Sequence, residues 1–482
     1  MAIFYQAGEQ KKRPGVYQRH TNTGVPAPSA ATDGVCAIPI QAHWGPLGKV
    51  VKNTLIRDLT DTYGSGTYGS GYTVPAAVEM FNGGASTVYT YRLGTGGTAA
   101  SYVISGGSES GQALTVTAKY PGTMPVSIAV QNNVGDASMK QFLVYAGTEL
   151  VETWPFTADS QHEGANLIAA TAASEYVTIT NTGSAAMGTV PIIAVSAGAL
   201  TNGTDPTVAN SDYSTAFAAL EPFYYNTIAI DVNDNSTLTL SLLLQAYLDN
   251  AYQYGKLGIA VVGEATTVDF NTRATHAKSF NDAKVVYLGG GYQAGTVNKD
   301  GVLAICYTAG VIASTPSNQA ITHAVIPEAT DLLETLTYAQ YDTAVDNGML
   351  LLSMAPDGSI WYDTGIDTLT NPDVATQDDG WKKIRRVKVR FELINRMDNA
   401  LSPLVGRVSA DSDGISNIIQ TAQRILDAMA NNEGKLAPGA TIYEDPQNPF
   451  TGDSAWFIIQ ADDTDSLEKI YLQYQFRYSQ NS

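Results

Sequence analysis

Cysteine, histidine and long apolar runs are scarce in this sequence, and each scarcity excludes a class of protein. The only two cysteines in 482 residues are Cys36 and Cys306, which support neither a disulfide framework nor a cysteine metal site. The five histidines show none of the close spacings of zinc sites, so we expect no metal and no cofactor. No run approaches the ~18 apolar residues of a membrane span, and the N-terminus lacks the apolar stretch of a secretory signal. We therefore expect a protein that is made and folded in the cytoplasm.

Charged residues make up only 15% of the chain, and the net charge is −19. Such an acidic protein is a poor general ligand for nucleic acid or for anionic membranes. Glycine (44 residues) and tyrosine (27 residues) are abundant instead, and this composition suits a β-rich assembly protein better than a highly solvated enzyme. A chain of 482 residues also predicts more than one domain.

The most informative stretch is Leu467 to Tyr478, in which apolar and polar residues alternate. A period of two is typical of a half-buried β-strand. The residues on its apolar face are Ile470, Leu472, Tyr474, Phe476 and Tyr478. No turn and no second strand follow, so this strand requires a sheet formed elsewhere, in its own subunit or in another.

The first 25 residues form an arm rather than part of a core. They are polar and basic and contain proline and glycine, and such termini are often loose unless a partner holds them. A short extended piece within this arm consists of Pro14, Gly15, Val16 and Tyr17.

Between the two ends, the pattern of elements changes twice. Residues 94–210 contain short alternating runs separated by glycine or proline, which predict an inserted all-β region of one or two small modules. From Asn226 onward, short apolar runs alternate with amphipathic helices, as in an open α/β sheet. Residues 415–429 predict a further amphipathic helix with Asp413 as its N-cap.

The sequence therefore predicts an α+β multidomain protein with a discontinuous α/β core, an inserted all-β region and terminal strand-forming arms. We expect the insertion on the outer surface of an assembly, because its composition offers no charged surface for a partner. The expected segments are an N-terminal linking arm (1–25), a first part of the core (26–93), the β-rich insertion (94–210), a second part of the core (211–370), a C-terminal α+β domain (371–465) and a C-terminal linking strand (466–482).

An enzymatic alternative rests on polar residues at the ends of the predicted parallel strands. Asp231, Glu264 and residues 289–291, which are all glycine, fall where open α/β sheets place their ligands. No histidine, lysine or nucleophile stands in the same turns to complete a mechanism, and strand ends commonly carry polar caps. A GxGxxG pattern at residues 64–69 lacks the preceding strand and the following acid of a dinucleotide site, which favours a tyrosine-rich loop.

A basic stretch and an acidic region lie near the C-terminus. Residues 382–396 carry a net charge of +6, and residues 408–465 carry −8. Two interpretations stay open: balance within the chain on a solvated surface, or a surface complementary to another subunit or to an enclosed partner. Nucleic acid is the weaker third alternative, because few aromatic residues interleave with the cations. The candidate contact residues are Lys382, Lys383, Arg385, Arg386, Lys388 and Arg390.

A series of short segments, taken in order along the chain, resembles the contractile-tail sheath family, especially the sheaths of phages and phage-tail-like particles from Gram-positive bacteria. The segments are RPGVY at 13–17, WGPLGKV at 44–50, FNGGASTVYTYRL at 81–93, YPG at 120–122, FYYNTIAIDV at 223–232, AGVIAS at 309–314, NGMLLL at 347–352, IDTLT at 366–370, WKKIRRVKVRFELI at 381–394 and DSLEKIYLQYQF at 465–476. Each is weakly specific by itself, but together they extend over most of the chain. Residues 123–210 match no part of the pattern.

The resemblance implies a structural subunit rather than an enzyme. Sheath subunits assemble as stacked hexameric rings around an inner tail tube, and they contract when the baseplate triggers, which drives the tube through a target cell envelope. Terminal strands are expected to join neighbouring subunits by adding to their sheets, and the helix at residues 415–429 is expected toward the tube. The implied partners are other copies of the chain in a helical stack, the tube protein, and baseplate and tail terminator proteins, with no nucleic acid and no membrane insertion.

The same resemblance implies a location and an energy source. The protein would assemble in the cytoplasm of a bacterial host and then form part of the tail of a virion or extracellular particle. The energy of contraction would be the difference between two sets of interfaces, so no nucleotide is needed. The resemblance leaves open whether the particle is a phage, a tailocin or another injection device.

Overall fold

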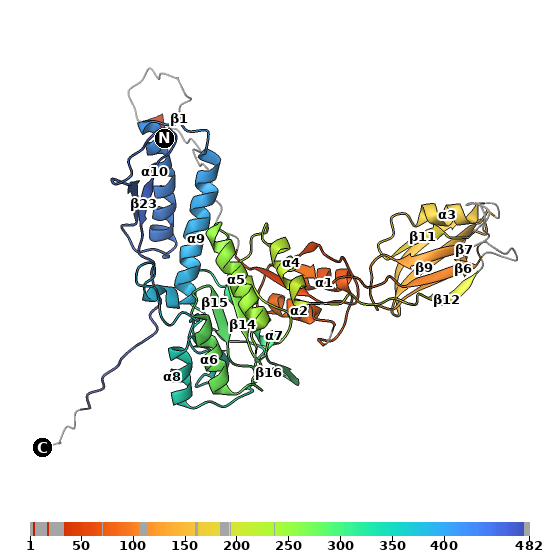
Figure 1. Cartoon of the computed structure of the whole chain (residues 1–482), viewed down its shortest axis with the longest axis horizontal. Coiled ribbons are helices and arrows are strands. Elements are labelled where there is room, and N and C mark those ends of the chain that lie inside the picture. The colour runs from red at the N-terminus through yellow and green to blue at the C-terminus, as the bar shows by residue number, and fades with distance from the viewer. Residues whose placement is uncertain are drawn as a thin grey trace. The chain divides into compact units, whose positions relative to one another are not determined.

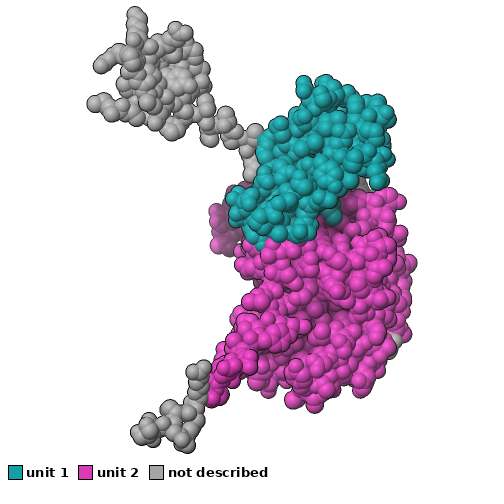
Figure 2. Space-filling view, turned by 90° about the vertical axis from the view of Figure 1, so that its left-hand side faces the viewer, with its two compact units in different colours: residues 1–32, 392–462 teal, residues 33–391, 463–482 magenta. Residues whose placement is uncertain are grey.

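The computed structural model describes residues 33–69, 71–105, 113–159, 162–183, 192, 194–235 and 237–476, together with the backbone of residues 3–4 and 17–18. The chain divides into two compact units, which Figure 2 draws in different colours. Unit 1 comprises residues 1–32 and 392–462, and unit 2 comprises residues 33–391 and 463–482. Helices and several separate sheets occur together, which confirms the predicted α+β multidomain class.

The central element of unit 2 is a seven-stranded sheet with the order β19-β15-β14-β13-β3-β5-β4. Its strands are β3 (Val35–Ile40), β4 (Val50–Asn53), β5 (Thr87–Arg92), β13 (Thr227–Ile228), β14 (Ile259–Gly263), β15 (Val285–Leu288) and β19 (Met349–Leu350). Neighbouring strands are parallel except β4, which is antiparallel to β5. Because β3 and β5 precede the β-rich insertion and the remaining parallel strands follow it, the core is discontinuous, as the sequence predicted.

Helices cover both faces of this sheet, because its strands carry apolar side chains on both sides (Figure 1). Along β3, Ile38 and Ile40 belong to one apolar cluster, whereas Val35 and Ala37 belong to the other, as the period of two requires. The first cluster includes side chains of α1 (Ile56–Tyr63), α2 (Val74–Asn82) and α7 (Val302–Ser314). The second includes side chains of α4 (Asn210–Leu220), α5 (Thr239–Gln253), α6 (Phe270–Phe280) and α8 (Tyr338–Asp346).

Helices α2 and α7 approach so closely that their contact requires glycine. A Cβ atom on Gly83 would lie 2.1 Å from the carbonyl oxygen of Tyr307, and one on Gly310 would lie 2.1 Å from that of Met80. Interiors are packed too densely to absorb such overlaps, so a larger residue at either position would push the two helices apart.

Residues 101–199 form a β-sandwich with a core of its own. One sheet has the order β10-β9-β8-β12 and the other the order β11-β7-β6. The strands are β6 (Ser101–Ser105), β7 (Ala113–Ala118), β8 (Val126–Asn132), β9 (Met139–Ala146), β10 (Glu149–Thr157), β11 (Val177–Asn181) and β12 (Val195–Ala199). Side chains of both sheets share one apolar cluster, so the described strands form one module rather than two. The region also contains a helix that the alternating pattern did not predict, α3 (Glu163–Ala170).

Short elements complete unit 2. They are the sheet of β16 (Tyr292–Ala294), β17 (Val297–Lys299) and β18 (Asp331–Leu332), the hairpin of β20 (Leu352–Met354) and β21 (Ile360–Tyr362), and a 3-10 helix (Asp379–Lys382). The basic stretch, for which the sequence analysis assigned no element, begins helix α9 (Ile384–Leu401). Among the described residues, no helix is both long and apolar enough to cross a membrane.

Unit 1 is built around helix α10 and a hairpin. Its elements are the part of α9 from residue 392 onward, a 3-10 helix (Ser402–Leu404), α10 (Ser412–Asp427), a π-helical turn (Ala428–Asn432), the hairpin of β22 (Thr441–Glu444) and β23 (Phe457–Gln460), and the parallel pair β1 (Ile3–Phe4) and β2 (Tyr17–Gln18). The predicted N-cap of α10 at Asp413 is wrong. Asp411 has the extended backbone of a cap, and its side chain accepts hydrogen bonds from the backbone N–H groups of Asp413 and Gly414.

A buried arginine, Arg92 at the end of β5, connects two loops of unit 2, the one between β3 and β4 and the one between β7 and β8. Its guanidinium donates to the carbonyl oxygens of Ala42 (2.9 Å), Gly45 (2.7 Å) and Pro121 (2.9 Å), and the residue has no exposed surface. Burial lowers the pKa of Arg92 to about 10, so the side chain stays charged at neutral pH. The carbonyl groups of Ala42 and Gly45 depend on this cation, because burial separates them from water.

We expect Arg92→Leu to lower the free energy of unfolding of the unassembled chain by at least about 2 kcal/mol, because it leaves buried acceptors without a donor. Chemical denaturation followed by circular dichroism measures the change. The matched control is Lys52→Leu on the neighbouring strand β4, where the side chain is exposed; it should change stability by no more than about 0.5 kcal/mol. Equal stability of the two variants would contradict the role assigned to Arg92.

Candidate functional site

Asp231, the first candidate of the enzymatic alternative, lies three residues beyond β13 and is completely buried. Tyr213 donates its hydroxyl hydrogen to Oδ1 (2.6 Å), while Thr73 (2.5 Å) and Gln41 (3.4 Å) donate to Oδ2. Burial raises the pKa of Asp231, and the hydrogen bonds from Thr73 and Tyr213 oppose that rise. Both carboxylate oxygens of Asp231 therefore accept hydrogen bonds from other side chains of unit 2. Through these bonds Asp231 connects α2, α4 and the sheet.

Glu264, the second candidate, immediately follows β14 and is likewise buried. Its Oε2 accepts hydrogen bonds from the hydroxyl of Tyr287 (2.5 Å) and from Nδ1 of His276 (2.6 Å). Burial raises the pKa of Tyr287, so that hydroxyl keeps its proton and acts as a donor. The sequence placed no histidine in the same turn, and His276 reaches Glu264 from helix α6 through the tertiary fold.

The glycine-rich candidates have structural explanations. Gly289 follows β15, and its carbonyl oxygen accepts a hydrogen bond from the buried guanidinium of Arg273. Gly64 follows helix α1 rather than a strand, and its carbonyl oxygen accepts from the hydroxyl of Tyr72 (2.6 Å). Both segments are turns closed by side chains of unit 2. Among the described residues, no group of three or more His, Cys, Asp or Glu side chains is placed to hold a metal ion.

The six basic candidates are all engaged or buried within unit 2. Lys382 pairs with Asp379, and Lys388 donates to backbone carbonyl oxygens of α7 and the loop after it. Arg385 is only 6% exposed. The remaining three, Lys383, Arg386 and Arg390, form ion pairs with Asp463, Asp465, Glu468 and Asp378. Balance within the chain thus accounts for much of the basic stretch, and contact with a tube or a neighbouring ring stays a prediction.

Asp463 is the most enclosed acid of this cluster, with 7% of its side chain exposed. Burial disfavours its ionisation, but hydrogen bonds and positive charge from Arg386 and Arg390 outweigh that effect and lower its pKa. The sequence analysis counted Asp463 and Asp465 within the acidic region and left charge balance with the basic stretch open, but it did not identify which acids pair with which cations. The opposite charges of the two regions were the available signal.

Beyond this cluster, the C-terminal segment is extended and exposed. The predicted apolar face lies in solvent, with exposed fractions of 70% for Ile470, 69% for Leu472, 73% for Tyr474 and 94% for Phe476. The rings of Tyr474 and Phe476 stack with centroids 6.3 Å apart, as expected for residues two apart on one face. The described residues 464–476 belong to no sheet, so the strand predicted here has no partner within the described chain.

The structure describes residues 3–4 and 17–18 of the N-terminal arm. Tyr17 begins β2, whose backbone pairs in parallel with β1 in the register Ile3 with Tyr17. Pro14, Gly15 and Val16 lie outside the described residues. Tyr478, at the end of the C-terminal face, lies outside them as well.

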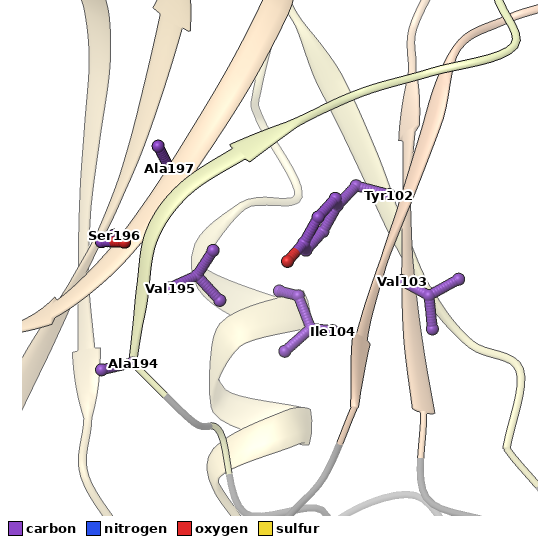
Figure 3. A pocket seen from close by; sticks show the side chains of 7 residues that line it. All are labelled: Tyr102, Val103, Ile104, Ala194, Val195, Ser196 and Ala197. Atoms are coloured by element: carbon purple, nitrogen blue, oxygen red, sulfur yellow. The ribbon is translucent and has the colours of Figure 1, made fainter.

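One shallow groove lies in the β-sandwich, between the edge strands β6 and β12 (Figure 3). Its volume is about 320 Å³. In Figure 3 the side chains of Tyr102, Ile104 and Val195 point toward one another across it. The lining carries no charged side chain, so the groove offers none of the groups that acid–base or metal chemistry requires.

We expect Asp231→Ala to cost about 1–3 kcal/mol of stability, because it leaves the buried hydroxyl groups of Tyr213 and Thr73 without an acceptor. Denaturant unfolding of the unassembled chain measures this loss, and Asp342→Ala on the exposed face of α8 is the control. A variant as stable as its parent would contradict the structural role of Asp231.

The comparisons with known proteins together cover nearly the whole chain. The phage tail sheath protein central domain matches residues 207–363, and the phage tail sheath protein beta-sandwich domain matches residues 84–205. The uncharacterized protein YqbK of Bacillus subtilis is 27% identical over 98% of this chain and 99% of its own length.

Solved structures show the same fold. The sheath tail protein of Desulfitobacterium hafniense has a TM-score of 0.70 and 20% identity, covering 93% of this chain and 100% of that protein. The contracted helical sheath of the anti-feeding prophage has a TM-score of 0.52 and 12% identity, covering 97% of this chain and 99% of that one. The two domain matches cover more than half of the sequence. The chain therefore belongs to the phage tail sheath protein family, whose members are structural proteins and not enzymes.

Proposed function

We propose that this protein is the sheath subunit of a contractile particle. It polymerises as stacked hexameric rings around an inner tail tube, and contraction of the stack drives the tube through a target cell envelope. The observation that carries the proposal is the C-terminal segment, whose apolar face is exposed in the single chain and whose backbone belongs to no sheet in its described part. Burying each of these large side chains in an assembly would contribute about 1.5–3 kcal/mol.

The hairpin of β22 and β23 in unit 1 is a suitable acceptor for such a strand. In the described chain its sheet contains these two strands alone, and two-stranded sheets gain stability from further strands. Trp456 and Ile459 are 43% and 39% exposed there, and they offer apolar surface to an added strand. An arm from another copy would be held by main-chain hydrogen bonds and would gain specificity from alternate side chains.

Strand links of this kind suit contraction, because they can persist while the bodies of the subunits rotate between two packings. The fold is shared with a sheath solved in its contracted state, which supports a subunit that can enter such a packing. The free energy would come from the difference between two sets of interfaces, so no nucleotide or cofactor is required.

The proposal includes the remaining partners and the location. The subunit would contact its own copies, the tube protein, the baseplate and a tail terminator. Helix α10 would lie toward the tube, and the β-sandwich would lie on the outer surface. Assembly would take place in the host cytoplasm, and the finished particle would carry the sheath in its tail.

Removal of either arm tests the proposed linkage. We expect deletion of residues 1–20 or of residues 466–482 to leave a folded body that no longer polymerises, because each deletion removes one side of the joint between subunits. Circular dichroism checks the fold, and negative-stain microscopy checks for tubes. Ordered tubes from either truncated chain would show that the arms do not link the subunits.

A matched pair of substitutions separates the apolar face from the rest of the arm. Leu472→Lys should abolish tubes, because it places a charge on the face that becomes buried, which is costly without a partner. Gln473→Lys adds the same charge to the opposite face one residue away and should assemble normally. Microscopy and sedimentation compare the two variants, and equal assembly would contradict burial of that face.

Limited proteolysis tests the outer position of the insertion. In assembled particles, sites within residues 94–210 should be cut before sites within residues 381–430, because an outer domain stays accessible to protease. Mass spectrometry of the fragments gives the order of cleavage. Earlier cleavage within residues 381–430 would place the insertion elsewhere.

A further inference from the structure

We propose that Lys383, Arg386 and Arg390 form an ionic clasp that anchors the first residues of the C-terminal arm to unit 2 and thereby sets the direction in which the arm leaves the subunit. The acidic side of the clasp consists of Asp463, Asp465 and Glu468. The anchoring is a property of the single chain, whereas its consequence for assembly rests on the proposed sheath function.

The strongest contact of the clasp is bidentate. Arg386 donates from Nε and Nη2 to the two carboxylate oxygens of Asp463, and the second of these bonds is 3.0 Å long. A bidentate arginine–carboxylate pair fixes the orientation of the two side chains as well as the distance between them. Both side chains are largely enclosed, with 22% of Arg386 and 7% of Asp463 exposed, so solvent screens the pair far less than an open surface pair.

Arg390, one turn further along α9, reinforces the same carboxylate. Its Nη2 lies 3.0 Å from Oδ1 of Asp463 and 2.9 Å from Oδ1 of Asp378. Its guanidinium also stacks over the ring of Trp381, 4.6 Å from the centroid. The cation is therefore held in place from several sides before the arm contributes any contact.

The third point of attachment lies further along the arm. Lys383 pairs with Glu468 and lies 3.3 Å from Asp465, and Thr322 donates its hydroxyl hydrogen to Oε1 of Glu468 (3.0 Å). Only 12% of the Glu468 side chain is exposed. From Ile470 onward the large side chains are mostly in solvent, so the anchored part ends at about Glu468.

Arg385 adds a driving force for closing the clasp. Its side chain is buried, its Nε and Nη1 atoms have no hydrogen-bond partner among the described residues, and burial lowers its pKa. The charges of Asp465, Asp463 and Glu468 act in the opposite direction and favour its charged form. Removal of the arm would leave this buried cation without compensating charge.

The position of the clasp along the chain explains why it can control the arm. The chain leaves unit 2 after Phe391 and re-enters it at Asp463. Asp463 is thus the first residue of the returning segment, and it binds two arginines of the outgoing one. A force applied to the arm would pass through these ion pairs into α9 rather than along a free chain.

A spin label on Leu467→Cys reports the clasp in the unassembled full-length chain. Leu467 is 83% exposed and lies between Asp465 and Glu468, so the label points to solvent while its backbone is anchored. The native Cys36 and Cys306 are buried, and burial raises the pKa of both thiols, which leaves the introduced cysteine as the reactive one. We expect an immobilised component in the spectrum at low salt that is only partly lost at about 1 M salt, because enclosed ion pairs are screened less than exposed ones.

Substitutions on both sides of the clasp identify the partners. Arg386→Gln with Lys383→Gln, and separately Asp463→Asn with Glu468→Gln, should each abolish the immobilised component. The second pair leaves every cation in place, so its effect cannot come from a lost tube contact. The charge exchange Lys383→Glu with Glu468→Lys keeps an ion pair at this point of the clasp. It should therefore keep part of the immobilised component that either substitution alone would remove. The control is Asp61→Asn, which removes an exposed ion pair with Arg57 and should leave the spectrum unchanged.

Circular dichroism confirms that each variant is folded, and microscopy then counts tubes. Loss of the immobilised component in both pairs of variants supports the clasp, whether or not tubes still form. The clasp would be overturned if the folded variant Asp463→Asn with Glu468→Gln held the label as immobile as the parent chain does. If the label becomes mobile but tubes form normally, the clasp exists and its proposed consequence for assembly is wrong, a result distinct from the arm deletions.

Discussion

The structure of unit 2 depends on the parallel pairing of β3 with β13, two strands that lie almost two hundred residues apart in the sequence. This pairing brings the N-terminal strands β3 and β5 into the same sheet as β14, β15 and β19. It also returns the chain to the core after the whole β-sandwich, so the sandwich is free to have a separate apolar core. Helices α2 and α7 then cover one face at a distance that only glycine permits at Gly83 and Gly310.

Two polar groups that look like catalytic candidates serve this core instead. Asp231 and Glu264 lie at strand ends, where many α/β enzymes bind their ligands. In this protein the oxygens of Asp231 accept hydrogen bonds from Tyr213, Thr73 and Gln41, and Glu264 accepts from Tyr287 and His276. The same position in the fold therefore holds covering helices against the sheet, which agrees with a structural family.

The two ends of the C-terminal segment differ in their chemistry, and the difference fits a linking element. The first residues carry acids that meet cations of α9, so they bind within the subunit. The following residues carry large apolar side chains that stay in solvent, so they require a surface that the described part of the chain does not provide. An arm that is fixed at its start and unsatisfied beyond it can reach a neighbour without losing its direction.

The sequence by itself determined the local elements with a strong period. The strands of residues 94–210 and the amphipathic helix at residues 415–429 were predicted, and the structure has the β-sandwich and α10 there, because hydrophobic periodicity is a local signal. The alternation of apolar and polar residues over 470–476 could equally be predicted, because a period of two is visible in the sequence without knowledge of the partner. Only the tertiary structure could decide how charges pair: Arg386 and Asp463 are separated by 77 residues, and His276 reaches Glu264 from another element. Charge counts show that opposite charges exist, but the folded backbone selects which of them meet, because ion pairs depend on distances of a few ångströms that sequence spacing does not specify.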